Sequence, residues 1–596
     1  MGIEFQKRKE QHMQMKIKIA VIVLLTGCLQ WGLAQEEGED IGTETVTVTK
    51  AYTPSISDAF KIKSFPVTND SIELQKKKLK YKIHSIPVAS TFTPAKGKAT
   101  AVKKTPPPEL FNSYASFGFG SYANALAEFY TSRPINRDQR LDIGFDHNSS
   151  RGNIDGVALD NIFSDSEISG SYSLRDRDYD WGANVGFQHQ IYNWYGLPED
   201  IDDPVTINGI DERQQYFMGE AGAYINLEDT YIKSGSFKYR RFWDAVKSGE
   251  NRVILGGALD FPLGEESLNI NLNVDYLNGT FANASLNNPN NDTDIKYSQF
   301  QVGINPSLAM LRDDLSLKLG VNFVYGMDTE ASEGSFYIYP AVTASYRLVG
   351  ETVIAYGGIE GQLKQNSYYG FVDENPFVSP TLSVAPTDSQ YDAYGGVKGQ
   401  LLPNLGYNVR ISYVAENNRP LFKLNPSNSF RSDDKGYYYG NSFEVFYDDV
   451  KTIGFFGELN VDVNRNFTFR LNGSYSSYTT ETDNPAWNLP KLEGNLFFDY
   501  QIGEKWFLGA NLFYVGERED VATQATLSGI PSDFPATAIT LDGYFDANAH
   551  VGHRLNNQLS VFLRASNIAN NKYQRWANYR VQGFQILGGA TYKFDF

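Results

Sequence analysis

The chain has 596 residues and a formal net charge of −17, and 41% of its residues are hydrophobic. Tyr, Phe and Trp together make up 14% of the residues and glycine occurs 52 times, a balance that suits β-sheet. The acidic excess argues against a nucleic-acid partner, because phosphate binding needs a basic face. The single cysteine, Cys28, excludes a disulfide framework. Beyond the N-terminus no stretch approaches the roughly 20 apolar residues of a membrane-spanning helix, so a membrane could be crossed only by strands.

Residues 1–35 are typical of an export signal peptide. A basic region ends in MKIKIA, the apolar run AVIVLLTG follows, and the small residues Gly32 and Ala34 stand where cleavage before Gln35 would need them. An alternative interpretation is that Leu25 to Cys28 resembles a lipobox, which would make Cys28 a lipidated first residue.

The N-terminal segment 36–110 has two parts. Its residues 43–50 read TETVTVTK, a short strand-like alternation of Thr and Val. The rest contains the basic run KKKLKYK at 76–82 and ends in the Pro-rich TPPPEL at 105–110. Low hydrophobicity, proline and like charges favour an extended or disordered tether over a folded domain.

Residues 111–596 repeat one pattern, about ten residues of apolar and polar alternation followed by a connection. Leu268, Ile270 and Leu272 alternate with Asn269 and Asn271, for example. Tight turns near 227–230, 264–266, 312–314, 402–404, 464–466 and 556–557 alternate with long polar loops near 193–213, 278–295, 366–389, 416–440, 517–538 and 571–583. This asymmetry predicts an all-β, transmembrane antiparallel barrel of about 22 strands, with tight periplasmic turns and long outer loops. The barrel must close, because an open sheet edge in lipid leaves backbone groups unpaired.

Two further features fit a barrel in outer-membrane lipid. Aromatic residues near strand ends, such as Trp181, Trp194 and Tyr195, are expected to form interfacial girdles. The final strand places Tyr592, Phe594 and Phe596 on one face, and this terminal aromatic pattern resembles the signal read by the barrel assembly machinery. The alternative is an ordinary last strand. The segment 443–449 is assigned to a long loop, and the strand count would change if it paired.

No arrangement of residues indicates an enzyme or a cofactor. His550 and His553 are three apart in a strand, so they face opposite sides and cannot share a metal ion. Two kinds of loop residue could bind ligands. Acidic side chains suit calcium but are equally ordinary turn formers, and they are Asp200, Asp202 and Asp203. Loop tyrosines could stack on a ligand or simply pack together, and they are Tyr368, Tyr369, Tyr437, Tyr438 and Tyr439.

The stretch YFDANAHVGHRLNNQLSVFLRASNIANNKYQRW, with the final strand, resembles the closing strands of TonB-dependent receptors. A count of 22 strands is also typical of that family. The resemblance implies that the alternating residues near the mature N-terminus are a TonB box, and these are Glu44, Thr45, Val46, Thr47, Val48 and Thr49. Such a box would add as an edge strand to the periplasmic domain of a TonB-type energy-transducing protein.

The chain departs from that family in one respect. Typical members carry a plug domain of well over a hundred residues inside the barrel, whereas only about 60 residues separate Lys50 from the first barrel strand here. A barrel of this size with nothing inside would be a wide channel. The lumen must then be closed by the tether, by loops folded inward, or by a partner protein. The resemblance implies energised uptake of a substrate through the outer membrane of a Gram-negative bacterium. The alternative is a barrel without active uptake, acting as a scaffold or as part of a translocation complex.

Overall fold

The computed structural model describes residues 110–199, 201–264, 266–282, 294–427, 435–521 and 538–595. Cys28, the segment Glu44 to Thr49, Asp200 and Phe596 lie outside these ranges, and so do the expected signal peptide and tether. The predictions made for them therefore stay predictions.

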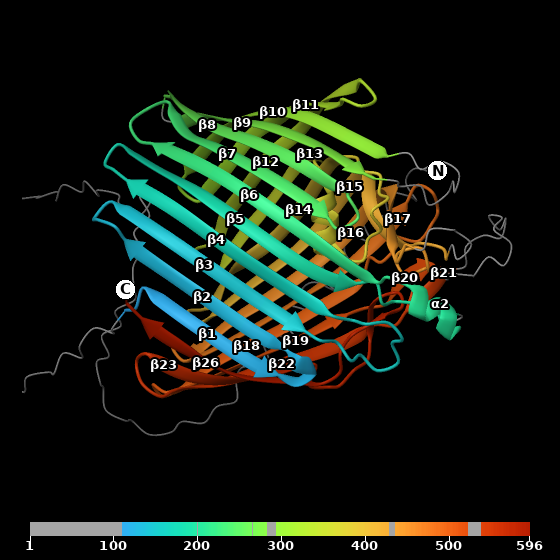
Figure 1. Cartoon of the computed structure of the whole chain (residues 1–596). Coiled ribbons are helices and arrows are strands. Elements are labelled where there is room, and N and C mark those ends of the chain that lie inside the picture. The colour runs from blue at the N-terminus through green and yellow to red at the C-terminus, as the bar shows by residue number, and fades with distance from the viewer. Residues whose placement is uncertain are drawn as a thin grey trace, which may run out of the picture. The chain divides into compact units, whose positions relative to one another are not determined.

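The described chain forms one antiparallel sheet of 22 strands that closes on itself (Figure 1). Closure is made by the first and last strands, β1 (Ser113–Gly120) and β26 (Gln585–Phe594), which pair from Ser113 opposite Phe594 to Gly120 opposite Leu587. The predicted fold class and strand number are confirmed. The other wall strands, each paired with its neighbour along the chain, are β2 (Ala125–Pro134), β3 (Gln139–Ser150), β4 (Phe163–Arg175), β5 (Tyr179–Asn193), β6 (Arg213–Leu227), β7 (Ile232–Asp244), β8 (Gly249–Leu263), β9 (Glu266–Phe281), β10 (Ile295–Arg312), β11 (Leu315–Asp328), β12 (Glu333–Val349), β13 (Val353–Lys364), β14 (Thr387–Leu402), β15 (Leu405–Leu424), β16 (Phe443–Asn464), β17 (Phe467–Thr480), β18 (Leu492–Ile502), β19 (Trp506–Val515), β22 (Tyr544–Arg554) and β23 (Leu559–Ser566).

The remaining elements lie in the connections. Two small hairpins form separate two-stranded sheets that are not part of the barrel wall, one of β20 (Arg518–Val521) and β21 (Ala538–Leu541), the other of β24 (Gln574–Trp576) and β25 (Tyr579–Arg580). The helices within the described residues are η2 (Ser121–Ala123), α2 (Pro204–Gly209) and α3 (Tyr368–Glu374). None of the helices within the described ranges is both long and apolar enough to cross a membrane.

The alternation of side chains gives the wall two different faces. Large apolar side chains point outward and are exposed over much of their surface, for example Phe117 (63%), Val185 (62%) and Ile338 (62%). In water such a belt would be strongly unfavourable, whereas in a bilayer it is solvated by acyl chains. The inward positions beside them are polar or small, because they face the lumen. The protein is therefore a transmembrane barrel of the outer-membrane type.

The two ends of the barrel differ as predicted. Each of the six predicted tight turns joins neighbouring strands at one end, as between β6 and β7 and between β10 and β11. Asp229 and Asp313 take positive φ angles (46° and 44°) in these two turns, a conformation that Asp tolerates better than most residues. The long connections, with α2 and the hairpin of β20 and β21, gather at the other end, on the right in Figure 1.

The assignment of 443–449 to a loop is wrong. These residues begin β16, which pairs with the C-terminal end of β15 from Phe443 opposite Leu424 to Asp448 opposite Arg419. The expected loop from 416 was likewise placed too early, since β15 continues to Leu424. Phe443 and Val445 are buried while Phe446 packs partly buried against a second cluster, so apolar residues occupy both faces and the alternation is lost. The strand count is unaffected, because one long hairpin is extended and no new pair is added.

The wall is much taller on one side than on the other. β15 and β16 have 20 and 22 residues, whereas β1 and β23 have 8 each. About ten tilted residues are enough to cross a bilayer. The upper parts of β15 and β16 therefore extend beyond the membrane on the side of the long loops.

Candidate functional site: the capped mouth of the barrel

The largest buried apolar cluster lies at the loop end of the barrel, and the connection 365–386 between β13 and β14 is at its centre. This connection forms α3, whose first turn is fixed by the Ser367 hydroxyl accepting a hydrogen bond from the Gly370 amide (3.1 Å). Tyr368, Phe371 and Val372 are the buried residues of the helix. The helix thus presents an apolar face to its surroundings although it belongs to a loop.

The helix contacts two separate sectors of the wall. The Tyr368 ring lies 5.1 Å from that of Phe242 on β7 and 4.9 Å from that of Phe281 on β9. On the other side, Phe371 makes an edge contact with Phe422 of β15 (6.1 Å). Because β7 and β9 are separated from β15 by several strands, α3 lies across the inside of the barrel mouth.

The 365–386 segment also meets a hairpin from the far side. The Phe377 ring stacks on Tyr579 of β25 with centroids 3.7 Å apart, and packs edge-on against Tyr195 (5.7 Å) from the connection between β5 and β6. The Tyr579 hydroxyl donates a hydrogen bond to the carbonyl oxygen of Asn441 (2.6 Å), which precedes β16. Four connections from different sectors of the barrel therefore meet at one point. We call the assembly of their described residues the cap, and these are 194–199, 201–212, 365–386, 435–442 and 567–584.

A second buried cluster extends the cap. Trp194 packs edge-on against Tyr437 (5.1 Å), which in turn contacts Tyr438 (4.7 Å). The Asn441 side-chain amide donates hydrogen bonds to the carbonyl oxygens of Trp194 and Gly436, both at 2.7 Å. These buried hydrogen bonds fix the position of the 435–442 loop against the loop that begins at Trp194.

Two wall carboxylates hold the 365–386 segment from below. Glu250 of β8 is buried, and its Oε2 accepts hydrogen bonds from the Tyr368 amide (2.7 Å) and the Tyr297 hydroxyl (3.0 Å). Its Oε1 accepts one from the Tyr369 amide (3.1 Å). Asp244 of β7 accepts a hydrogen bond from the Tyr368 hydroxyl (2.9 Å). Burial, with the Asp244 charge beside it, raises the pKa of Tyr368 well above its usual value, so this hydroxyl remains a donor.

The hairpin of β20 and β21 is fastened to the rest of the loop end through Asp520. Asp520 is buried, and its carboxylate accepts hydrogen bonds from the amides of Leu424 (3.0 Å) and Val521 (2.8 Å) and from the Asn488 side chain (2.7 Å). Burial raises the pKa of Asp520 to about 6, although these three hydrogen bonds oppose the rise. The hairpin is thereby tied to β15 and to the connection between β17 and β18.

A cavity of about 590 Å³ lies inside the barrel next to α3. Tyr369 and Asp373 of the helix line it on one side, and lumen-facing residues of β2 to β6 on the other. Three of these wall residues are carboxylates, Asp142, Glu167 and Glu220. The chamber is therefore polar and acidic, with Glu220 paired to Lys238 (2.8 Å).

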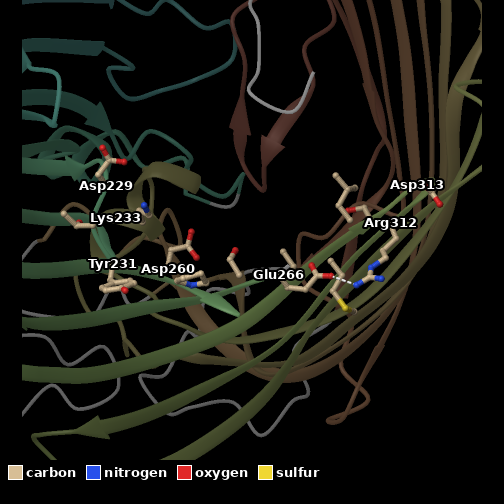
Figure 2. A pocket seen from close by; sticks show the side chains of 14 residues that line it. Asp229, Tyr231, Lys233, Asp260, Glu266, Arg312 and Asp313 are labelled. Atoms are coloured by element: carbon tan, nitrogen blue, oxygen red, sulfur yellow. Dashed lines mark hydrogen bonds and ion pairs between the residues drawn. The ribbon is translucent and has the colours of Figure 1, made fainter. Parts of the chain in front are cut away.

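A larger cavity, of about 1270 Å³, lies at the opposite end among the tight turns that precede β7, β9 and β11 (Figure 2). Asp229, Tyr231 and Lys233 lie on one side of the view and Arg312 and Asp313 on the other. Arg312 pairs with Glu266 (3.0 Å), which stands between these groups. The cavities place open volume both next to the cap and at the periplasmic end of the lumen.

The tyrosines predicted as ligand contacts are brought together by the structure, but inside the cap. Tyr368, Tyr437, Tyr438 and Tyr439 are buried, and Tyr369 lies partly buried beneath the Arg240 guanidinium (3.9 Å from the ring centre). Contact with a ligand stays a prediction for them, and it would require the cap to move. The girdle role expected for Trp194 and Tyr195 is wrong, because both pack inside the cap. Aromatic residues near a strand end look the same in sequence whether lipid or a folded loop covers them.

Of the acidic loop residues that are described, Asp203 has a structural role. Asp203 caps α2 by accepting hydrogen bonds from the amide (3.0 Å) and hydroxyl (2.8 Å) of Thr206, and these bonds lower its pKa. Asp202 is exposed. In the described part of the chain, no three His, Cys, Asp or Glu side chains are grouped as a metal site would need.

The predicted outward face of the last strand is present in β26. Tyr592 and Phe594 stack on each other (5.8 Å), and Tyr592 is exposed on the lipid side. Their role in assembly stays a prediction. Glu250, Asp244 and Asn441 were not singled out from the sequence, because a carboxylate or amide facing the lumen looks like any other polar position of the alternating pattern.

Comparisons with known proteins rest on structure alone. No protein-family model matches the chain, and neither does any curated protein. The siderophore receptor PirA from Acinetobacter baumannii superposes with a TM-score of 0.62 at 13% identity, over 81% of this chain and 80% of that one. The ferripyoverdine receptor of the outer membrane of Pseudomonas aeruginosa gives 0.60 at 14% identity, over 82% and 72%. The copper transporter OprC gives 0.56 at 13% identity, over 82% and 81%.

The chain has the barrel fold of these TonB-dependent receptors. The resemblance seen in the closing strands thus extends over the whole described barrel. The matched proteins are receptors and transporters.

Proposed function

We propose that this protein is a receptor and transporter of the TonB-dependent type in the outer membrane of a Gram-negative bacterium. A substrate would be captured at the capped mouth and pass through the lumen, with Glu44 to Thr49 as the coupling strand. The observation that carries the proposal is the 22-strand barrel with four loops folded over its outer end, a barrel fold shared with siderophore and copper receptors.

The geometry supports a path for a polar substrate. The cap covers the outer end, an acidic chamber lies next to α3, and a second cavity opens among the periplasmic turns. Energy for moving the cap or the substrate would come from a TonB-type protein, which adds the 44–49 segment to its own sheet. Such an addition needs free backbone N–H and C=O groups along the segment.

The coupling strand can be tested directly by binding. The full chain, purified in detergent, is titrated with the periplasmic domain of the TonB-type protein from the same organism. Val46→Pro removes a backbone donor and blocks strand pairing, so we expect the affinity to fall by about tenfold or more. Ile56→Pro, outside the segment, serves as the matched control and should bind like the unaltered chain.

Other results would redirect the assignment. If the unaltered chain does not bind the TonB-type domain, or if Val46→Pro binds equally well, coupling through this strand is refuted. The barrel would then be better explained as a scaffold or a component of a translocation complex whose lumen is sealed by a partner.

A further inference from the structure

The 365–386 segment occupies the lumen side of the barrel mouth without being part of the wall. Glu250, which holds the segment, points into the lumen. Leu255 lies five positions further along the same strand, so it points to the opposite face, and it is exposed on the lipid side. Tyr368 and Phe371 pack on Phe242 and Phe422, which belong to wall sectors on either side. The segment therefore crosses the opening through which any solute would enter.

The segment is joined to the wall by contacts that can be broken without opening the barrel. Its backbone meets β16 at an isolated parallel bridge, where the Ser379 amide donates to the Phe443 carbonyl (2.8 Å) and the Phe443 amide donates to the Phe377 carbonyl (3.1 Å). The neighbouring strands β13 and β14 pair with each other below it, from Lys364 opposite Thr387. Loss of the segment's contacts would leave the wall ladder intact.

The fastening at Glu250 is chemically suited to release. Two of its three donors, the amides of Tyr368 and Tyr369, belong to the segment, and the third, the Tyr297 hydroxyl, belongs to the wall. If the segment moves away, the carboxylate keeps the Tyr297 bond and gains water in place of the two amides. Hydrogen bonds to a charged group are strong while they are dry but are readily replaced by water.

We propose that residues 365–386 are the gate of the lumen, closed in this structure and released when the backbone of Tyr368 and Tyr369 leaves Glu250. The inference goes beyond the proposed function, because the lumen of such a barrel needs closing whether or not the protein takes up a substrate.

The test is conductance of the purified full chain in planar bilayers. The unaltered protein should be closed most of the time. Glu250→Ala removes the acceptor and should raise the fraction of time spent open by about tenfold or more, the loss expected when charge-assisted hydrogen bonds are removed. Glu458→Ala is the matched control, since Glu458 of β16 also faces the lumen and is hydrogen-bonded to Asn460 on its own strand. It should remain closed.

A reversible lock separates gate movement from general damage. Val378 and Phe443 are partners in the isolated parallel bridge, and neighbouring strands lie about 5 Å apart, within the Cα–Cα reach of a disulfide. In a Cys28→Ser background, Val378→Cys with Phe443→Cys is added to Glu250→Ala. We expect this protein to be closed when oxidised and to open on reduction. Heat-modifiable migration on gels confirms that each variant contains a folded barrel.

The outcomes decide the proposal. Conduction by Glu250→Ala that is abolished by the disulfide and restored by reduction supports it. A permanently open unaltered protein refutes it, because the segment would then not close the lumen. A protein whose 365–386 segment is replaced by a short Gly and Ser linker, and which folds yet stays closed, also refutes it. Binding of the TonB-type domain is measured separately, so failure of the gate and failure of the proposed coupling are distinguishable.

Discussion

Protonation of Asp520 should strengthen the attachment of the β20 and β21 hairpin to β15 and to the connection between β17 and β18. The carboxylate belongs to β20 of the hairpin, is buried, and accepts hydrogen bonds from Leu424, Val521 and Asn488. These bonds offset only part of the cost of burying its charge, since burial raises its pKa from 3.8 to about 6. The docked hairpin therefore favours the protonated acid more than the undocked hairpin does.

The magnitude follows from the difference between the two pKa values. A shift of about 2 units, at about 1.4 kcal/mol per unit, corresponds to about 3 kcal/mol. Below about pH 4 the group is protonated in both states and no penalty exists. Between about pH 4 and pH 6 only the undocked carboxyl ionises, so docking weakens as pH rises. Above about pH 6 the full penalty applies, and local opening should be about two orders of magnitude more frequent than at pH 4.

Amide hydrogen exchange in detergent or lipid vesicles measures this opening. Protection of the Val521 region, corrected for the intrinsic pH dependence of exchange, should fall between pH 4 and pH 7.5, while amides of β9 serve as an internal reference. Asp520→Asn keeps an acceptor without a titrating charge, so its protection should not change with pH. The reasoning is refuted if protection in the unaltered protein is independent of pH, or if the Asn variant retains the dependence.

Three further predictions concern the cap, the lipid face and assembly. Tyr579→Phe removes the hydroxyl bonded to the Asn441 carbonyl and should destabilise the cap by about 1–3 kcal/mol, seen as faster proteolysis of its loops; unchanged cleavage would contradict the role given to this bond. Val185→Arg on the lipid face should cost about 2–4 kcal/mol in urea unfolding from vesicles, whereas Asn184→Arg on the lumen face should cost far less; equal losses would contradict the assignment of faces. Tyr592→Ser with Phe594→Ser should slow barrel insertion by the assembly machinery, followed by heat-modifiable migration, whereas Lys593→Ser should insert normally; equal rates for both would show that the aromatic pair is an ordinary part of the strand.

The wall could be predicted from the sequence because lipid and lumen impose a period of two on every strand that crosses the membrane. Leu268, Ile270 and Leu272 show this pattern, and the tight turns mark where the strands reverse. The pattern fails where β15 and β16 leave the membrane. There Val445 faces the cap and Phe446 a different cluster, so both faces are apolar and Asp448 with Asp449 resembles a turn.

The cap could not be predicted, because its contacts join residues far apart in the chain. Phe377 and Tyr579 stack although about two hundred positions separate them, and Asn441 links Trp194 to Tyr579. Glu250 carries no local sign of its role, since the amides that it binds belong to a connection more than a hundred residues away. Sequence reasoning found the tyrosines of the cap and left open whether they pack or bind, and the structure shows them packed against the cap and the wall.

Because the strands of the wall differ in length, the opening of the barrel is asymmetric. At about 3.3 Å per residue, the 22 residues of β16 trace roughly 70 Å, whereas the 8 residues of β23 trace roughly 26 Å. A large molecule that diffuses along the cell surface therefore meets a barrel wall that is high at β15 and β16 and low at β1 and β23. A molecule that approaches over the low side, at β1 and β23, first meets the hairpin of β24 and β25, whose Tyr579 stacks on Phe377.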